Sequence, residues 1–365
     1  MIHQIGWHDL QFPHRIPVRF FSTAGVPQIR WEPVGVPHIP QKVVDGTFFL
    51  FASVEDARTG TNPGGSGFVV RYDGPPAPGY YRGRRPTDHF YAVTNWHVAV
   101  AGGFSVIRLN TADGSVDIID LGPEDWQFLP GMYDVCATPI TIRGDLHKVS
   151  SISTLTFCAD PSIPHNTGYK IGVGEDVFMI GLFVDHAGVG TNAPAARFGN
   201  ISMLPNRSAT LRQSTGYESV NYIVDMHSRS GFSGSPVYVY RTIGNDLSGN
   251  YVDAEVELRN VRIDTQLDKF SGKLRANNLF MLLGIHWGQF PEAWEIKSGR
   301  PRSSAEAHLL EADDRYVRGM SGMTCVIPAW HILEVLEMPK LKGPRDAATR
   351  QDDGSSDPIP ENATP

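Results

Sequence analysis

The sequence has 365 residues, including 37 glycines and 27 prolines, and 19% of its residues are charged. Glycine and proline together make up roughly one residue in six, above the average usage of about 12%, which argues against a helical bundle or coiled coil. The net charge of −7 removes the general electrostatic case for nucleic-acid binding. The longest apolar run, Val177 to Val184, is too short for a membrane helix of about 20 residues.

The N-terminus and the cysteines bear on the cellular compartment. The first eight residues contain neither the basic region nor the apolar stretch of a signal peptide. Cys136, Cys158 and Cys325 lie far apart without a CxxC pair, so a disulfide scaffold is not expected and a reducing compartment fits better. We therefore expect a cytoplasmic protein with no metal or organic cofactor and no nucleic-acid or membrane partner.

The first part of the chain is predicted to be an extended arm followed by a β-barrel. Residues 1–40 are rich in proline and aromatic residues without a clean period, and we interpret them as an N-terminal extended arm. Asp113-Gly114 between two apolar runs indicates a hairpin, and residues 145–168 are interpreted as a connector. Short β-type runs predict strands at Thr47–Ser53, Ser66–Tyr72, Phe90–Thr94, Phe104–Leu109, Val116–Ile119 and Val135–Ile140.

The second part repeats this pattern and ends differently. Pro328 opens a helical spacing over Ala329–Glu337, and residues 339–365 have a composition too polar to offset the entropy of ordering, which predicts a disordered tail. Six further runs predict strands at Asp176–Val184, Ala196–Met203, Asn221–Asp225, Val237–Tyr240, Leu279–His286 and Thr324–Ile327. The fold class expected is all-β, with two antiparallel β-barrels over 41–150 and 151–338 and a short C-terminal helix.

Three segments look like insertions: Asp73–Asp88, about 241–278 and about 289–318. The last contains Ser303–Arg315, whose spacing predicts an amphipathic helix. His308 and Glu311 could share a metal ion, although a solvated helix face is the simpler interpretation.

The sharpest chemical signal is Gly231-Phe232-Ser233-Gly234-Ser235-Pro236 before an apolar run. A serine hydroxyl needs a neighbouring base and hydrogen-bond donors for the developing oxyanion. Flanking glycines allow a tight turn whose amides, here those of Gly231 and Ser233, point at one spot. An ordinary Gly/Ser turn entering a strand explains the hexapeptide alone equally well, whereas the strand-to-helix elbow of α/β-hydrolases fits poorly.

Two further features supply partners for this serine. Tyr91 to Val98 forms a strand that delivers His97 at the start of a small-residue turn. Asp134 heads an apolar strand, where a partly buried carboxylate can accept a bond from an imidazole N–H and fix its tautomer. Asp117, Asp120 and Asp125 are competing acids nearby. The order His, Asp, Ser matches one of the known triad orders and would place His97 and Asp134 on one barrel and Ser233 on the next.

As a set, these motifs resemble the trypsin-like serine peptidases with the chymotrypsin fold, of the bacterial type that includes glutamyl endopeptidases and high-temperature-requirement proteases. The resemblance covers about 43–338. It implies His97 as general base, Asp134 as its orienter, Ser233 as nucleophile, and the Gly231 and Ser233 amides as oxyanion hole. The matching segments are Gly65 to Val70, Thr94 to Val98, Asp134 to Ala137, Gly231 to Pro236, Gly284 to Gly288 and Val326 to Pro328.

The resemblance also implies a specificity pocket. Gly284-Ile285-His286-Trp287-Gly288 is similar to the glutamyl endopeptidase segment whose histidine contacts the substrate carboxylate. Carried over, His286, Trp287, Gly288 and Ser228 would bind substrate. His286 could equally be a strand residue near the site. The position six residues before Ser233 is occupied by His227 and not by Asp, which argues against a trypsin-like preference for Lys or Arg.

Two functional hypotheses from different classes follow. The first is a serine endopeptidase acting on peptide or protein substrates, with a preference for an acidic residue before the scissile bond. The second is a catalytically weak protease-fold protein that binds a peptide or partner, favoured by Phe232, the insertions and the aromatic arm. An esterase on another fold is a third option. A separate regulatory protein partner is a further hypothesis, because a cytoplasmic protease must be restrained somehow.

Overall fold

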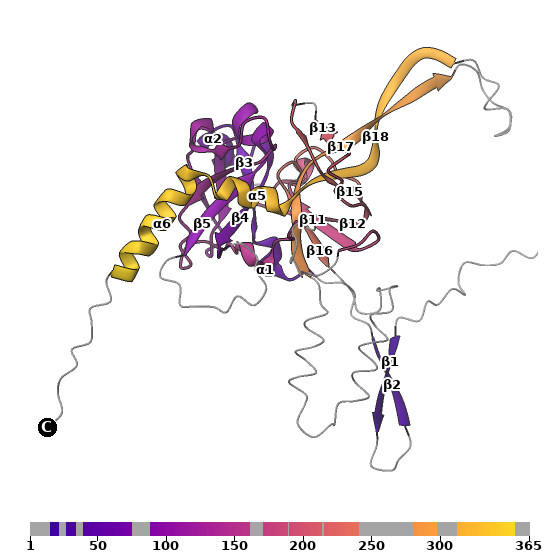
Figure 1. Ribbon diagram of the computed structural model, residues 1–365, viewed down its shortest axis with the longest axis horizontal. Coiled ribbons are helices and arrows are strands. Elements are labelled where there is room, and N and C mark those ends of the chain that lie inside the picture. Colours follow the sequence, from indigo (N-terminus) through magenta and orange to yellow (C-terminus); the bar gives the residue numbers. More distant parts are fainter. Residues whose placement is uncertain are drawn as a thin grey trace, which may run out of the picture. The chain divides into compact units, whose positions relative to one another are not determined.

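The computed structural model (Figure 1) describes residues 15–21, 27–33, 39–74, 88–160, 171–188, 190–213, 215–240, 280–297 and 312–354. The chain separates into two compact units, residues 1–40 and 41–365. The first unit contains an antiparallel pair of strands, β1 (Arg15–Phe21) and β2 (Pro27–Pro33). The remaining elements all belong to the second unit.

The first half of the second unit is an eight-stranded sheet in the order β7-β6-β3-β4-β5-β9-β8, with β10 pairing in parallel with β4. Asp113-Gly114 turns between two of its strands, and Gly114 has a φ of +84°, which glycine adopts without strain. The strands are β3 (Thr47–Phe51), β4 (Pro63–Tyr72), β5 (His89–Thr94), β6 (Val106–Asn110), β7 (Val116–Ile119), β8 (Gln127–Phe128), β9 (Cys136–Ile140) and β10 (Ile152–Ser153).

The second half is a closed barrel in the order β11-β12-β15-β18-β17-β16. Successive side chains of a strand point to opposite faces, so Val177 and Met179, like Val237 and Val239, lie together in its core. The strands are β11 (Asp176–Gly181), β12 (Ala195–Met203), β15 (Tyr222–Asp225), β16 (Pro236–Tyr240), β17 (Phe280–Lys297) and β18 (Ala312–Pro328), and a small separate hairpin joins β13 (Leu211–Arg212) to β14 (Glu218–Ser219).

The helices are short, apart from the last. A second core, including Phe48, Val69 and Trp126, fills the first half. None of the described helices is long and apolar enough to cross a membrane. The helices are α1 (Gln41–Val44), α2 (Val54–Thr59), the π-helical turn η1 (His97–Ala101), the 3₁₀ turns η2 (Pro123–Asp125), η3 (Thr154–Thr156) and η4 (Val184–His186), α5 (Ala329–Leu336) and α6 (Pro339–Gly354).

The expected all-β class, with two β units before a C-terminal helix, is confirmed. Each of the twelve predicted strands coincides with an observed one, the Asp113-Gly114 hairpin joins β6 to β7, and the helix predicted from Ala329 is α5. Strand pairing closes only the second half into a barrel, while the first half forms the sheet described above.

The segment 289–318 differs from the expected insertion with a helix. The strands β17 and β18 run on as one long antiparallel pair as far as Lys297 and Ala312, so the last four residues of the predicted helix are extended. The interstrand backbone bonds override the helical spacing there. His308, Glu311, the insertion at 241–278, residues 75–87 of Asp73–Asp88 and residues 161–168 of the connector lie outside the described residues.

The expected disordered tail is also wrong over Pro339–Gly354, which forms α6. The helix is held by tertiary contacts that composition cannot reveal. Leu341 is buried, and the guanidinium of Arg345 lies 3.5 Å from the ring centroid of Tyr72 while donating to the Tyr91 hydroxyl and to Glu337. Residues 355–365 lie outside the described residues.

We predict that Arg345→Ala lowers the free energy of unfolding by about 2–4 kcal/mol, because it removes a buried cation and leaves its partners incompletely bonded. Urea unfolding measures the change. The matched control is Arg58→Ala, whose exposed ion pair with Glu55 should contribute less than about 1 kcal/mol. Equal effects of the two substitutions would show that α6 is not anchored by Arg345.

Candidate active site

The centre of the site is a hydrogen-bonded pair of His97 and Asp134. The His97 Nδ1 lies 2.6 Å from Asp134 Oδ2, and the His97 backbone N–H donates to Asp134 Oδ1 at 2.8 Å. Because a carboxylate only accepts, Nδ1 carries the proton of this bond, and Nε2 of the neutral ring is left as a proton acceptor. Two bonds from one residue therefore fix both the position and the tautomer of the imidazole.

The backbone around His97 creates this geometry. Strand β5 ends at Thr94, the chain turns through the buried Asn95, and the π-helical turn η1 begins at His97. Asn95 Nδ2 donates to the carbonyl of Asp134 at 2.8 Å. This bond joins the segment that carries His97 to the segment that carries Asp134, in addition to the bonds between His97 and Asp134 themselves. Single π-helical turns occur frequently at functional sites.

Asp134 is a fully buried carboxylate, with none of its side chain exposed. Its charge reaches neighbouring groups. Burial first, and then the Asp134 charge, raises the pKa of the Cys136 thiol well above its usual value, and the same two causes raise the pKa of Tyr217 to about 12. Burial disfavours the charged form of both groups, and a negative charge nearby disfavours it further.

Ser233 lies on the loop that enters β16, and two glycines shape this loop. Gly231 has a φ of +97° and Gly234 a φ of +84°, in the left-handed region that favours glycine. A Cβ on Gly234 would lie 2.0 Å from the carbonyl oxygen of Ser66, so the loop packs directly against the backbone of β4. The loop accordingly requires glycine at 234 both for its conformation and for its contact.

Ser66 joins this loop to the first half of the unit. Its N–H donates to the Ser233 carbonyl at 2.9 Å, and its hydroxyl donates to the Gly231 carbonyl at 2.9 Å while accepting from the Leu182 N–H at 2.8 Å. The Thr94 hydroxyl donates to the Ser66 carbonyl at 2.7 Å, which ties the same residue to the strand that leads to His97.

The amides of Gly231 and Ser233 donate to no acceptor among the described residues. Both N–H groups are therefore available to a ligand. Amides left unbonded beside a serine hydroxyl can stabilise negative charge that develops on a carbonyl oxygen.

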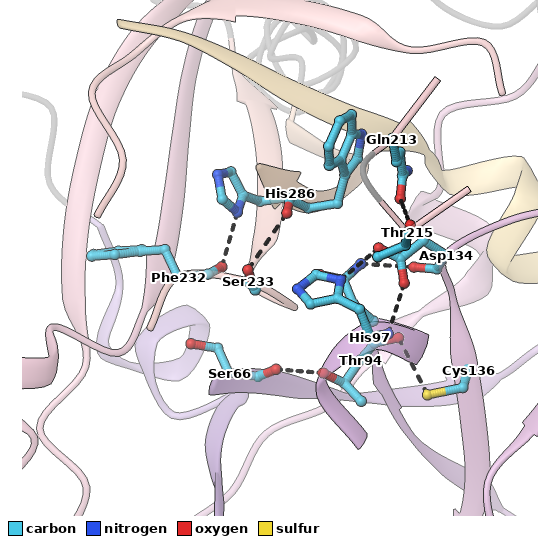
Figure 2. Close-up of polar contacts among 12 residues, drawn as sticks. Ser66, Thr94, His97, Asp134, Cys136, Gln213, Thr215, Phe232, Ser233 and His286 are labelled. Atoms are coloured by element: carbon cyan, nitrogen blue, oxygen red, sulfur yellow. Dashed lines mark hydrogen bonds and ion pairs between the residues drawn. The ribbon is translucent and has the colours of Figure 1, made fainter. Parts of the chain in front are cut away.

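Figure 2 shows the ring of His97 between Ser233 and Asp134. A Cβ on Gly65 would lie 2.8 Å from Val98 and 3.1 Å from the Ser233 carbonyl, so η1 and the Ser233 loop meet over the same strand. Within these described residues, no hydrogen bond joins Ser233 Oγ to His97; the hydroxyl instead donates to the Trp287 carbonyl over a long 3.5 Å. The structure thus joins His97 to Asp134 by hydrogen bonds, and Ser233 to neither.

His286 is buried, with 2% of its surface exposed. Its Nδ1 lies 3.1 Å from the carbonyl oxygen of Phe232. Burial first, and then the electrostatic influence of nearby His97, lowers the pKa of His286 to about 3, although its bond to Phe232 opposes the shift. The ring is therefore neutral at neutral pH.

The other residues expected to bind substrate lie around the same loop. The register of β17 against β18 shifts between His286 and Gly288. This β-bulge leaves Trp287 without a paired residue on β18. The Trp287 indole N–H donates to Asn221 Oδ1 at 2.8 Å. Ser228 is partly exposed, and its hydroxyl makes a 3.5 Å bond to the neighbouring carbonyl of Arg229.

Positive charge lies beside the Ser233 loop. Gly231 packs against Leu182, because a Cβ on Gly231 would meet that side chain. Phe183 follows Leu182 in the chain, and the guanidinium groups of Arg197 and Arg229 lie 5.8 and 6.0 Å from its ring centroid. Neither arginine has an ion-pair partner in the part of the chain that the structure describes.

The described residues contain no group of three or more side chains arranged to hold a metal ion.

Sequence reasoning did not assign roles to Ser66, Asn95 or Asn221. Ser66 was visible as part of Gly65-Ser66-Gly67, since a serine between two glycines in an otherwise apolar strand indicates a close backbone approach. Asn95 and Asn221 gave no such signal, because their contacts are made across the fold.

The depressed pKa of His286 makes stability depend on pH. Between the usual value of 6.5 and the folded value of about 3, the unfolded chain binds a proton here that the folded chain does not. The contribution of this residue is therefore complete above pH 6.5 and is lost as the pH falls toward 3. We predict that wild type loses stability more steeply than His286→Asn, by at most about 1.4 kcal/mol per pH unit.

Urea unfolding of the two proteins between about pH 7 and about pH 5 measures this difference. The matched control is His227→Asn at an exposed histidine, which should leave the slope of wild type unchanged. Parallel curves for wild type and His286→Asn would show that His286 is protonated within the folded protein.

Comparisons with known proteins give fold-level likenesses only. No protein-family model and no curated protein matches the chain. The crystal structure of the inactive form of the Rv3671c protease has a TM-score of 0.37 at 13% identity, covering 80% of this chain and 88% of that one. The active form, from M. tuberculosis, has a TM-score of 0.36 at 13% identity, covering 80% and 81%. These values are too low to carry an argument about family or chemistry.

Proposed function

We propose that the protein is a serine endopeptidase in which Ser233 is the nucleophile, His97 the general base and Asp134 the residue that orients His97. The observation that carries the proposal is the short bond from His97 Nδ1 to the buried carboxylate of Asp134. It leaves Nε2 as the basic atom of a fixed ring, and Ser233 lies across from that ring. The amides of Gly231 and Ser233 beside it donate to no acceptor in the part of the chain that the structure describes.

The reaction uses each group in turn. Rotation about the Cα–Cβ bond releases the Ser233 hydroxyl from the Trp287 carbonyl and turns it toward His97. Nε2 takes the hydroxyl proton as Oγ bonds to the carbonyl carbon of the scissile peptide, and the amides of Gly231 and Ser233 hold the resulting oxyanion. The protonated ring then gives its proton to the leaving amine, and water activated by Nε2 hydrolyses the acyl-enzyme.

A preference for acidic residues near the scissile bond is a finer part of the proposal, and Arg229 supports it better than His286. A neutral ring that donates from Nδ1 has only a lone pair at Nε2, and a lone pair repels a carboxylate. Arg229, by contrast, is an exposed cation without an ion pair among the described residues, two positions before Gly231.

A second candidate function is a protein of the same fold that binds peptides or a regulatory partner without cleaving them. The observation that favours it is the long bond from Ser233 Oγ to the Trp287 carbonyl instead of to His97. If this conformation persists when substrate is bound, the hydroxyl has no base.

We predict that a fluorophosphonate probe labels the wild-type protein and does not label Ser233→Ala. Asp134→Asn should lower the labelling rate by about 10³–10⁴-fold, because the asparagine amide favours the wrong tautomer of His97, and His97→Ala should lose at least as much. Rates are measured by gel fluorescence and the modified residue by mass spectrometry.

The matched control is Ser208→Ala, which changes an exposed serine and should be labelled as fast as wild type. A peptide digest must in addition show cleavage that disappears in Ser233→Ala. Equal labelling of wild type and Ser233→Ala would reject the proposal, whereas labelling without peptide cleavage would favour an esterase or the binding function.

For substrate choice, we predict that a peptide with Glu near the scissile bond is cleaved faster than the same peptide with Gln. Arg229→Gln should reduce this ratio of kcat/KM by about two- to fivefold, the worth of an exposed charge pair, and salt should weaken the effect. Arg58→Gln is the control at an exposed arginine on α2. An unchanged ratio in Arg229→Gln would exclude Arg229 from recognition.

A further inference from the structure

The backbone of β17 holds His286 against the loop that carries Ser233. The His286 N–H donates to the Ser235 carbonyl at 3.0 Å, and the His286 carbonyl accepts from the Gly234 N–H at 3.0 Å. The two residues that follow Ser233 are thus paired with one residue of the neighbouring strand. This pairing brings the imidazole to the other side of Ser233, at the carbonyl of Phe232.

Among the described residues, the imidazole makes one hydrogen bond, to that carbonyl. Because a carbonyl oxygen only accepts, His286 Nδ1 is the donor of the 3.1 Å bond. The Nε2 atom of the same ring is buried and has no partner among the described residues. A ring in this state has no N–H left to donate to substrate. The interaction that the ring makes is the hydrogen bond to the Phe232 carbonyl.

That bond fixes the direction of a catalytically important amide. The carbonyl of Phe232 and the N–H of Ser233 belong to one planar trans peptide, so they point in opposite directions. Holding the carbonyl toward His286 aims the N–H away from it. The Phe232 carbonyl also accepts from the Ser235 N–H at 3.0 Å, but that donor belongs to the same loop and moves with it, whereas His286 belongs to a different strand.

The peptide before it is held from the opposite half of the unit. The Ser66 hydroxyl donates to the Gly231 carbonyl, which belongs to the peptide that joins Gly231 to Phe232. Two successive peptides of the loop are therefore each fixed by a side chain from another element, Ser66 on β4 and His286 on β17. Neither Gly231 nor Ser233 donates its own N–H within the described residues.

We propose that His286 is a positioning residue that orients the Phe232–Ser233 peptide, so that the Ser233 N–H faces the oxyanion. The inference rests on the proposed endopeptidase function, since it assigns a role within the same site. It replaces contact with a substrate carboxylate, the role implied by the resemblance, because the tautomer set by Phe232 has no donor at Nε2. His286 acts through the Ser233 amide and touches no reacting atom.

The test compares three substitutions at this position. In His286→Asn the side-chain amide can take the place of Nδ1 and donate to Phe232. In His286→Gln it reaches toward the Nε2 position instead, and in His286→Leu no donor remains. The kinetics of inactivation by a fluorophosphonate separate the maximal rate of phosphonylation from the apparent affinity for the probe.

We expect His286→Leu and His286→Gln to lower the maximal rate by about 10- to 100-fold, toward the loss found when an oxyanion donor is removed. The apparent affinity should change by less than about twofold, because the oxyanion interaction develops only in the transition state. His286→Asn should recover most of the rate. If His286→Leu fails to fold, the comparison of Asn with Gln still decides, since both keep a polar amide.

Two NMR measurements on the full chain do not depend on turnover. The ¹⁵N spectrum of wild type should show Nδ1–H, neutral His286 at neutral pH, and the Ser233 amide shift should change in His286→Leu and return toward wild type in His286→Asn. A rate in His286→Leu equal to wild type, a wild-type Nε2–H tautomer, or an unchanged Ser233 amide would each overturn the inference. Wild type that labels poorly while both NMR results hold would instead reject the proposed function.

Discussion

The attachment of the Ser233 loop to β4 through Ser66 is the interaction on which the site depends. Ser66 forms hydrogen bonds to Ser233, Gly231 and Leu182 through its backbone and its side chain. Its carbonyl also accepts a hydrogen bond from the hydroxyl of Thr94, which ends the strand that leads to His97. Glycine at 234 permits this approach, because a Cβ there would overlap the Ser66 carbonyl. The base and the hydroxyl come from sheets more than a hundred residues apart in sequence, and this junction brings them together.

Burial gives the two histidines of the site different properties. His97 is bonded to a fully buried carboxylate, which fixes its tautomer and leaves its outer nitrogen basic. His286 is buried and faces a neutral carbonyl, and burial is the main cause that lowers its pKa to about 3. The first ring is suited to moving a proton, whereas the second is suited to holding a backbone peptide still. Residue type alone cannot distinguish these roles, because the partner of Nδ1 decides between them.

The sequence predicted the strands of the fold more accurately than it predicted the C-terminal tail or the start of β18. Alternating apolar residues, as in Val177 and Met179, report a half-buried strand locally, and all twelve predicted strands are present. The prediction of a disordered tail was wrong because a polar composition does not reveal tertiary contacts. Leu341 is buried, and Arg345 contacts Tyr72 and Tyr91 on the first sheet. The spacing that predicted a helix up to Arg315 was overruled in the same way, by the pairing of β17 with β18.

By itself, the sequence determined the strands, the order His97, Asp134, Ser233 and the glycines that shape the Ser233 loop, because these depend on residue type and short-range spacing. Only the tertiary structure decided that Asp134 bonds to His97 in preference to Asp117, Asp120 or Asp125, that Ser66 holds the loop, and that His286 faces the Phe232 carbonyl. These outcomes depend on which donors and acceptors meet when distant strands pair. Local sequence does not contain that information.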